Sequence, residues 1–191
     1  MSQTVLITGA SNGIGKACAR VFARKGYDLV LVARHREKLE AVKAELSEYD
    51  VQIKVIAMDL TGEDAAVDLY NDLVLDDISI DILVNNAGFG DHGAFHDSSW
   101  EKQKKMVLLN IVALMQMTYV FGQSMKRRKK GRILNVASIA GLCAGPYMST
   151  YYATKAFVLS FSESIAYELK DNNVEVSCLC PGPTKTGFMD V

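Results

Sequence analysis

The sequence has few of the residues that mark metal-binding or nucleic-acid-binding proteins. Its four cysteines, Cys18, Cys143, Cys178 and Cys180, form neither a C-x-x-C pair nor a zinc-ligand spacing. We therefore expect small buried side chains and no metal site. The formal net charge of −1 offers no surface for nucleic acid or an anionic membrane. The one basic run, residues 126–130, is interpreted as a solvated helix C-terminus that the helix dipole favours.

Long uninterrupted apolar runs are also missing. No basic segment precedes Val5-Leu6-Ile7, and that run is too short for a signal sequence. The most apolar stretch, residues 106–121, is interrupted by Asn110 and Gln116 and is expected to fall short of a membrane span. These absences predict a cytoplasmic protein without a membrane partner. With 49% hydrophobic and 23% charged residues, residues 1–191 are long enough to form one domain with a sizeable core.

Short β-branched runs alternate with helical patterns along the chain. Strands are expected at Thr4–Thr8, Asp28–Ala33, Gln52–Ala57, Asp81–Asn85, Arg132–Ala137 and Glu175–Cys180, and helices near 14–25, 36–48, 62–76, 98–125 and 150–171. The six strands are nearly continuous in apolar residues, as strands buried on both faces are. This alternation predicts an α/β protein of Rossmann type, with a doubly wound parallel sheet and helices on both faces. Ligands of such sheets bind beyond the carboxyl ends of the strands.

The segment TGASNGIGK, residues 8–16, follows the first strand and has the glycines of a phosphate-binding loop. A nucleoside-triphosphate loop, G-x-x-x-x-G-K-[ST], requires glycine and a hydroxyl where this sequence has Ala10 and Ala17. The spacing fits a dinucleotide-binding loop better, with backbone N–H groups at a helix N-terminus facing a pyrophosphate. The alternative is a tight turn with incidental glycines. The loop residues assigned to the cofactor are Gly9, Ser11, Asn12, Gly13, Ile14 and Gly15.

Arg34 follows the second strand, where NAD-binding folds usually place an acidic residue for the ribose 2′-hydroxyl. A guanidinium offers fork-shaped donors to a 2′-phosphate, so NADP(H) is favoured and NAD(H) is the other possibility. The alternative for Arg34 is a solvated residue that opens the next helix. After the third strand, Asp59 can accept from an adenine amino group or cap the helix expected near Gly62. Leu60 is assigned to the same cofactor site.

Polar and small residues follow the fourth and fifth strands. The fourth strand leads into NNAG, residues 85–88, in which the amides can tie the loop to a neighbouring strand while glycine lets the backbone lie close to a flat ligand. Asn86, Ala87 and Gly88 are therefore cofactor-site candidates. Ser138 stands at the end of the fifth strand.

Tyr151 and Lys155, within YYATK, share one face of the last expected helix because they are four residues apart. A nearby ammonium favours a phenolate and is expected to lower the tyrosine pKa, which suits an acid/base. A Tyr-x-x-x-Lys pattern alone equally fits a lysine stem that packs on a ring.

Together these motifs identify a resemblance to the classical short-chain dehydrogenases/reductases, extending from Thr8 to Thr186. The residues that carry it are TGASNGIG, Asp59, NNAG, Asn110, Ser138, YYATK and PGPTKT, in the order and at about the spacing of that family. The T-G-x-x-x-G-x-G form of the first motif matches the classical branch and differs from the T-G-x-x-G-x-x-G form of the extended branch.

The resemblance implies a catalytic set of Asn110, Ser138, Tyr151 and Lys155. Tyr151 would exchange a proton with the substrate oxygen as hydride moves between nicotinamide and a carbonyl carbon, and Ser138 would hydrogen-bond that oxygen. Lys155 would hold the nicotinamide ribose and lower the tyrosine pKa. Asn110 would position a water in a proton relay; by residue type alone, a buried amide that satisfies backbone groups is the alternative.

The same resemblance assigns the segment PGPTKTGF to the nicotinamide end, through Pro181, Gly182, Thr184 and Thr186. It also implies a homodimer or homotetramer formed through the helices that carry Asn110 and Tyr151. The helix that carries Tyr151 has apolar residues on more than one face, which is compatible with this: Phe157, Val158, Phe161 and Ile165. His92 and His96 are assigned no role.

The sequence therefore predicts an NAD(P)(H)-dependent oxidoreductase that acts on a small-molecule carbonyl or secondary alcohol. The alternative is a catalytically silent NADPH-binding sensor on the same fold. The sequence ends five residues beyond Thr186, at Val191, whereas the family continues with a substrate-covering helical segment and a seventh strand. We expect a truncated form of a longer reductase, in which Glu175–Cys180 becomes a sheet edge.

Overall fold

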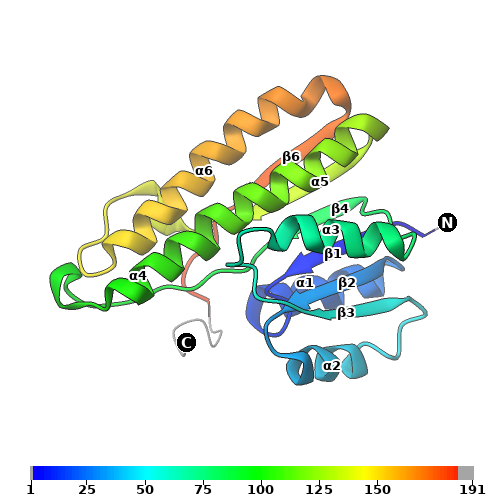
Figure 1. Ribbon diagram of the computed structural model, residues 1–191, viewed down its shortest axis with the longest axis horizontal. Helices are drawn as coiled ribbons and strands as arrows, with labels where there is room; N and C mark the ends of the chain where they lie inside the picture. Colours follow the sequence, from blue (N-terminus) through cyan, green and yellow to red (C-terminus); the bar gives the residue numbers. More distant parts are fainter. Residues whose placement is uncertain (1, 185–191) are drawn as a thin grey trace.

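A six-stranded, fully parallel sheet forms the centre of the molecule, in the order β3-β2-β1-β4-β5-β6 (Figure 1). The computed structural model describes residues 2–184. The strands are β1 (Thr4–Thr8), β2 (Asp28–Ala33), β3 (Ile53–Ala57), β4 (Ile82–Asn85), β5 (Gly131–Val136) and β6 (Val174–Leu179). All six expected strands are present, and the predicted doubly wound α/β fold is confirmed.

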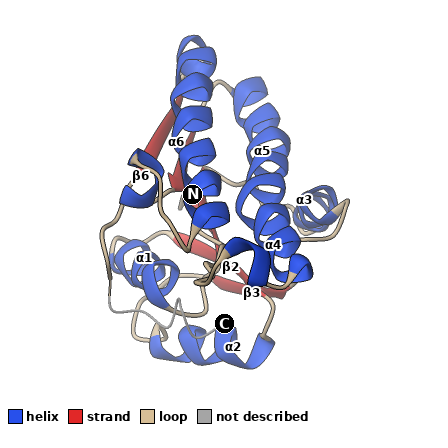
Figure 2. Cartoon of the chain, turned by 90° about the vertical axis from the view of Figure 1, so that its left-hand side faces the viewer, coloured by secondary structure: helices blue, strands red, loops and turns tan. Residues whose placement is uncertain are grey.

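Helices cover both faces of the sheet (Figure 2). They are α1 (Gly13–Arg24), α2 (Arg36–Glu45), α3 (Ala65–Leu75), α4 (Trp100–Val107), α5 (Leu114–Arg128) and α6 (Ser149–Leu169). Because successive strand residues point to opposite faces, alternate residues of β1 enter different cores. Val5 and Ile7 pack with α1 and α2, whereas Leu6 packs with α3 and α5. Burial on both faces explains the continuous apolar runs of the strands.

The long helical segment after β4 differs from the expected single helix. Leu108–Ala113, between α4 and α5, is π-helical and has Asn110 within it. Such π-helical turns are rare overall, and those that occur are often at functional sites. By length and composition alone, Trp100–Arg128 could cross a membrane, since its 29 residues include an 18-residue window of mean hydropathy 1.4, so the expectation for residues 106–121 is not supported. Core helices share this property, and 44% of that window is buried inside the protein.

Two helix boundaries also differ from expectation. The helix expected from residue 62 begins at Ala65, with Asp64 at its N-cap position, so Asp59 does not cap it. The last long helix ends at Leu169 and is followed by a short 3-10 turn, Lys170–Asn172. Strand β6 is an edge of the sheet within the described residues, as expected, with Leu179 40% exposed on it.

Candidate active site

The glycine loop between β1 and α1 brings backbone N–H groups to the carboxyl end of the central strand. Gly9 and Gly13 adopt positive φ angles of 64° and 51°, which only glycine reaches without strain. Helix α1 begins at Gly13, and the side chain of Asn12 at the N-cap makes no capping hydrogen bond. The first N–H groups of α1 therefore remain available to an anion, as a pyrophosphate-binding loop requires.

The loop after β4 is fixed against the glycine loop by paired hydrogen bonds. The Thr8 hydroxyl oxygen accepts from the backbone N–H groups of Asn86 at 2.9 Å and Ala87 at 3.0 Å. The Asn86 amide donates to the carbonyl oxygens of Thr8 at 3.0 Å and Gly9 at 3.1 Å. A Cβ on Gly15 would lie 2.3 Å from the Gly9 carbonyl oxygen, so the two loops and α1 meet with no room for a side chain. The amides thus tie the loop to the neighbouring strand, as predicted.

Asn110 links this loop to α6. Its amide oxygen accepts from the Phe89 backbone N–H at 3.1 Å, and its Nδ2 donates to the Phe89 carbonyl at 2.9 Å and to Thr154 Oγ1 at 3.1 Å. Thr154 in turn donates to the Tyr151 carbonyl oxygen at 2.7 Å. A Cβ on Gly88 would lie 2.9 Å from the Asn110 amide oxygen. In these contacts Asn110 satisfies backbone groups, the alternative given by residue type, and the water relay stays a prediction.

Lys155 lies beneath the end of β5 and is only 5% exposed. Its ammonium donates to the Val136 carbonyl oxygen at 2.8 Å. Burial lowers the lysine pKa to about 8, and the neighbouring thiols of Cys178 and Cys180 act weakly in the opposite direction. A cation held under the strand ends, with a lowered pKa, is typical of a functional site.

Ser138 and Tyr151 meet above Lys155. The two side chains share a hydrogen bond, and the Lys155 Nζ lies 5.8 Å from the centre of the Tyr151 ring. Burial raises the pKa of Tyr151, and the hydrogen bond with Ser138 only partly opposes this. The expectation that this pKa is lowered is therefore wrong. The phenol is protonated and poised to donate.

The residues expected at the adenosine end lie beyond β2 and β3. Arg34 is exposed and takes part in no ion pair among the described residues, although its charge helps to lower the pKa of Asp59. The main cause of that lowered pKa is the backbone N–H of Thr61, which donates to Asp59 at 3.0 Å. Leu60 is buried. Lys16 pairs with Glu45 at 2.6 Å, so it is engaged on α2, unlike the phosphate-binding lysine of a triphosphate loop.

The segment after β6 lies against the end of β5. The Pro181 carbonyl oxygen accepts from the Ile139 backbone N–H at 3.1 Å and from the Ser138 hydroxyl at 3.5 Å. Gly182 accepts from the Thr184 hydroxyl at 2.9 Å. Thr186 lies outside the described residues. Within residues 2–184 no group of three or more His, Cys, Asp or Glu side chains is placed to hold a metal ion.

A buried polar network behind the site was not predicted. The Asn85 amide donates to Thr118 at 3.0 Å and to Asn135 at 2.9 Å, and the Asn135 amide donates to Ser162 at 2.9 Å. This chain joins β4, β5, α5 and α6 and so fixes the helix that carries Tyr151. The signal was Asn135 itself, a polar residue inside an apolar strand, because buried polar groups require partners.

The residues present fit a nicotinamide dinucleotide. The available N–H groups of α1 suit a pyrophosphate, and exposed Arg34 suits a charged group on the adenosine ribose. The Ser138, Tyr151 and Lys155 side chains stand at the other side of the same row of strand ends. That span, with a phosphate-binding loop between two polar ends, matches the chemistry of a dinucleotide.

Comparison with known proteins supports this. The family described as short chain dehydrogenase matches residues 3–190. "Nodulation protein G" of Rhizobium sp. (strain N33) is 35% identical and aligns with 98% of this chain and 76% of its own. The 7beta-hydroxysteroid dehydrogenase of Mediterraneibacter gnavus is 30% identical, covering 95% of this chain and 68% of its own.

Solved structures agree with the sequence relatives. A short-chain dehydrogenase from Sphingobium yanoikuyae in complex with NADPH superposes with a TM-score of 0.92 at 37% identity, over 97% of this chain and 73% of that one. The bulky-bulky ketone specific alcohol dehydrogenase from Comamonas testosteroni gives 0.90 at 37% identity, over 96% and 74%. From these matches and from the Ser138, Tyr151 and Lys155 geometry, the chain belongs to the short-chain dehydrogenase family of oxidoreductases.

Proposed function

We propose that this protein is an NADP(H)-dependent oxidoreductase that interconverts a carbonyl and a secondary alcohol. The observation that carries the proposal is the hydrogen-bonded pair of Ser138 and Tyr151 standing over buried Lys155 at the carboxyl ends of the strands. Such a pair combines a proton donor with a second donor aimed at the same acceptor oxygen, which is what carbonyl reduction needs.

The chain's own residues handle the proton and the orientation. Tyr151, kept protonated by burial, gives its phenolic proton to the substrate oxygen, while the Ser138 hydroxyl donates to that oxygen as negative charge develops. Lys155 would hold the ribose hydroxyls and place its positive charge beside the phenol. Asn110 would hold the Phe89 loop against α6 through its hydrogen bonds to Phe89 and Thr154. When bound, the nicotinamide supplies or accepts the hydride.

Arg34 supports NADP(H) over NAD(H). Its guanidinium is exposed just after the end of β2. The next two residues, His35 and Arg36, carry no carboxylate. Arg36 is already paired with Glu40 at 3.5 Å, so Arg34 is the residue left to bind a 2′-phosphate. The NADPH complex of the Sphingobium yanoikuyae neighbour points the same way.

A homodimer or homotetramer in the cytoplasm completes the proposal. Val112, Met115 and Tyr119 are 46%, 40% and 68% exposed and recur at helical spacing on one face of the long helix. A row of exposed apolar residues on a helix is typical of a helix-to-helix interface. The four cysteines are free thiols, which supports a reducing compartment.

The test is a substrate panel. Purified protein is mixed with NADPH, and separately with NADH, and the loss of cofactor absorbance is followed with ketones, aldehydes and 3-oxoacyl thioesters. The proposal predicts that at least one ketone is reduced and that kcat/KM is higher with NADPH. Tight NADPH binding without turnover across the panel would favour a silent cofactor sensor instead.

A further inference from the structure

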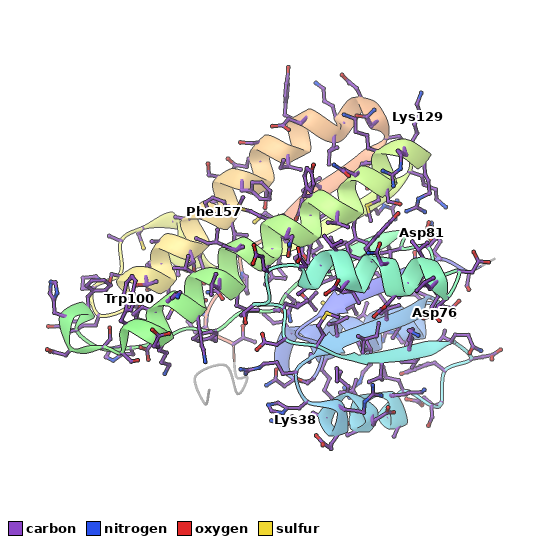
Figure 3. All side chains as sticks on the ribbon, viewed as in Figure 1. Lys38, Asp76, Asp81, Trp100, Lys129 and Phe157 are labelled. Atoms are coloured by element: carbon purple, nitrogen blue, oxygen red, sulfur yellow. The ribbon has the colours of Figure 1, made fainter. Side chains whose placement is uncertain are left out.

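Exposed apolar side chains lie in the loops that flank Ser138 and Tyr151. Ile139 and Leu142, in the turn directly after Ser138, are 47% and 66% exposed, and Tyr147, four residues before Tyr151, is 62% exposed. Phe95, in the loop after β4, is 48% exposed. Both loops lie at the end of the molecule where α4 begins (Figure 1), and Trp100 of α4 stands at that end in Figure 3. Apolar groups left open beside a polar reacting centre are typical of a ligand-binding cleft.

The two loops are braced against each other at Tyr147. The Gly93 backbone N–H donates to the Tyr147 carbonyl oxygen at 2.8 Å, and the His92 ring stacks on the Tyr147 ring with centroids 6.1 Å apart and an interplanar angle of 26°. Asp91 anchors the first loop to α4 through Lys102 at 2.9 Å and Gln103 at 3.0 Å. The His92 ring thus stacks on the Tyr147 ring, and Tyr147 stays largely exposed to solvent.

Tyr147 holds this position at an energetic cost. Its φ of 64° is in the left-handed region, which is strained for a residue with a side chain and almost free of strain for glycine. The turn around it already uses glycine where space is short, since a Cβ on Gly145 would lie 2.4 Å from the Tyr152 ring. A tyrosine in a position that suits glycine indicates that the ring itself is used, because backbone strain concentrates at functional sites.

The charges of the two loops restrict the substrate further. The segment IAGLCAGPYM, residues 139–148, contains no charged residue, and FGDHGAFHDS, residues 89–98, contains no lysine or arginine. Asp91, in the second of these segments, forms an ion pair with Lys102. These loops therefore offer no cation to a phosphate, a carboxylate or a coenzyme A group.

We propose that the substrate is a neutral ketone or secondary alcohol with a large, flat apolar body that stacks on Tyr147 and rests on Ile139 and Leu142. This inference rests on the oxidoreductase function proposed above and names the substrate class for that site. Tyr147 is then a specificity-determining residue, which the catalytic motifs did not include.

The kinetic test compares a bulky and a small ketone, 2-acetylnaphthalene and 2-butanone. Tyr147→Ala should raise KM for 2-acetylnaphthalene about tenfold, since it removes both the ring-ring contact and the apolar area that the ring buries. The KM for 2-butanone should change less than about twofold, because a small substrate does not reach the ring. Tyr147→Phe should behave as wild type, and Tyr167→Ala, which removes a 73% exposed tyrosine on α6, serves as the control.

A binding measurement separates this inference from the proposed function. Saturation-transfer NMR follows contact between 2-acetylnaphthalene and the protein with NADP⁺ present. Transfer that is present in wild type and lost in Tyr147→Ala supports the inference even if wild type reduces no ketone, in which case only the proposed function fails. Equal transfer in both proteins, or none in wild type, overturns it and indicates that other residues of the chain or a second copy cover these loops.

Discussion

Lys155 shows how the environment of a single residue sets its chemistry. An ammonium that is 5% exposed and donates to the backbone carbonyl of Val136 is costly to keep charged, and burial lowers its pKa to about 8. The pKa of Tyr151, whose ring centre lies 5.8 Å from the Lys155 Nζ, is raised by burial, which keeps the phenol neutral. The site therefore holds a protonated phenol beside a lysine that titrates near the physiological range.

The lysine shift predicts a pH dependence of stability. The unfolded chain keeps this proton up to about pH 10.5 and the folded protein only up to about pH 8, so between these values the unfolded state binds more protons. The free energy of unfolding contributed by this group is therefore lowest below pH 8 and rises as pH increases to 10.5. Urea unfolding of wild type and Lys155→Met across this range should show curves that are not parallel. Parallel curves would mean that the lysine pKa is not lowered.

Cofactor choice is also decided by one residue. Arg34→Asp should weaken NADPH binding about ten- to hundredfold, since it removes a charge-assisted phosphate contact and adds repulsion, and should change NADH binding much less. Isothermal titration with both cofactors measures this. Arg36→Asp, two residues further along the chain and paired with Glu40, is the matched control. Equal losses for both cofactors in Arg34→Asp would show that this guanidinium does not contact the phosphate.

At the scale of elements, the strands were predictable and the irregular segments were not. Burial on both faces makes each strand a continuous apolar run, so every expected strand lies within one residue of its position. The π-helical turn at Leu108–Ala113 has no local sequence signal, because it depends on how Asn110 reaches Phe89 and Thr154 in the folded protein. For the same reason the motif located Asn110 but could not give its partners.

The glycine loop gives a test at this scale. Gly15→Ala should destabilise the protein by about 1–3 kcal/mol and weaken NADPH binding, because its Cβ would lie 2.3 Å from the Gly9 carbonyl oxygen and overpack the junction with Asn86. Gly62→Ala is the control, since its nearest neighbour would be 3.6 Å away. Thermal unfolding with and without NADPH measures both effects. A Gly15→Ala protein as stable as Gly62→Ala would contradict the close packing described.

For the whole molecule, the proposed interface is the exposed face of the long helix. The double substitution of Met115 and Tyr119 by Glu should convert a dimer or tetramer to a monomer, because it places charges in an apolar contact. Light scattering measures the mass. Leu75→Glu, on α3 at an 85% exposed position, is the control and should not change it. A wild-type protein that is already a monomer, or a double variant that stays assembled, would rule out this interface.

The central claim is that Tyr151 is the proton donor, and a pair of adjacent substitutions tests it. Tyr151→Phe and Tyr152→Phe each remove one hydroxyl from neighbouring rings, whose centroids are 6.2 Å apart. Steady-state kcat with the best ketone of the panel and the Kd for NADPH are measured for both. We predict that Tyr151→Phe lowers kcat by about three orders of magnitude or more with little change in Kd, and that Tyr152→Phe retains activity. Near-wild-type turnover by Tyr151→Phe would contradict the assignment.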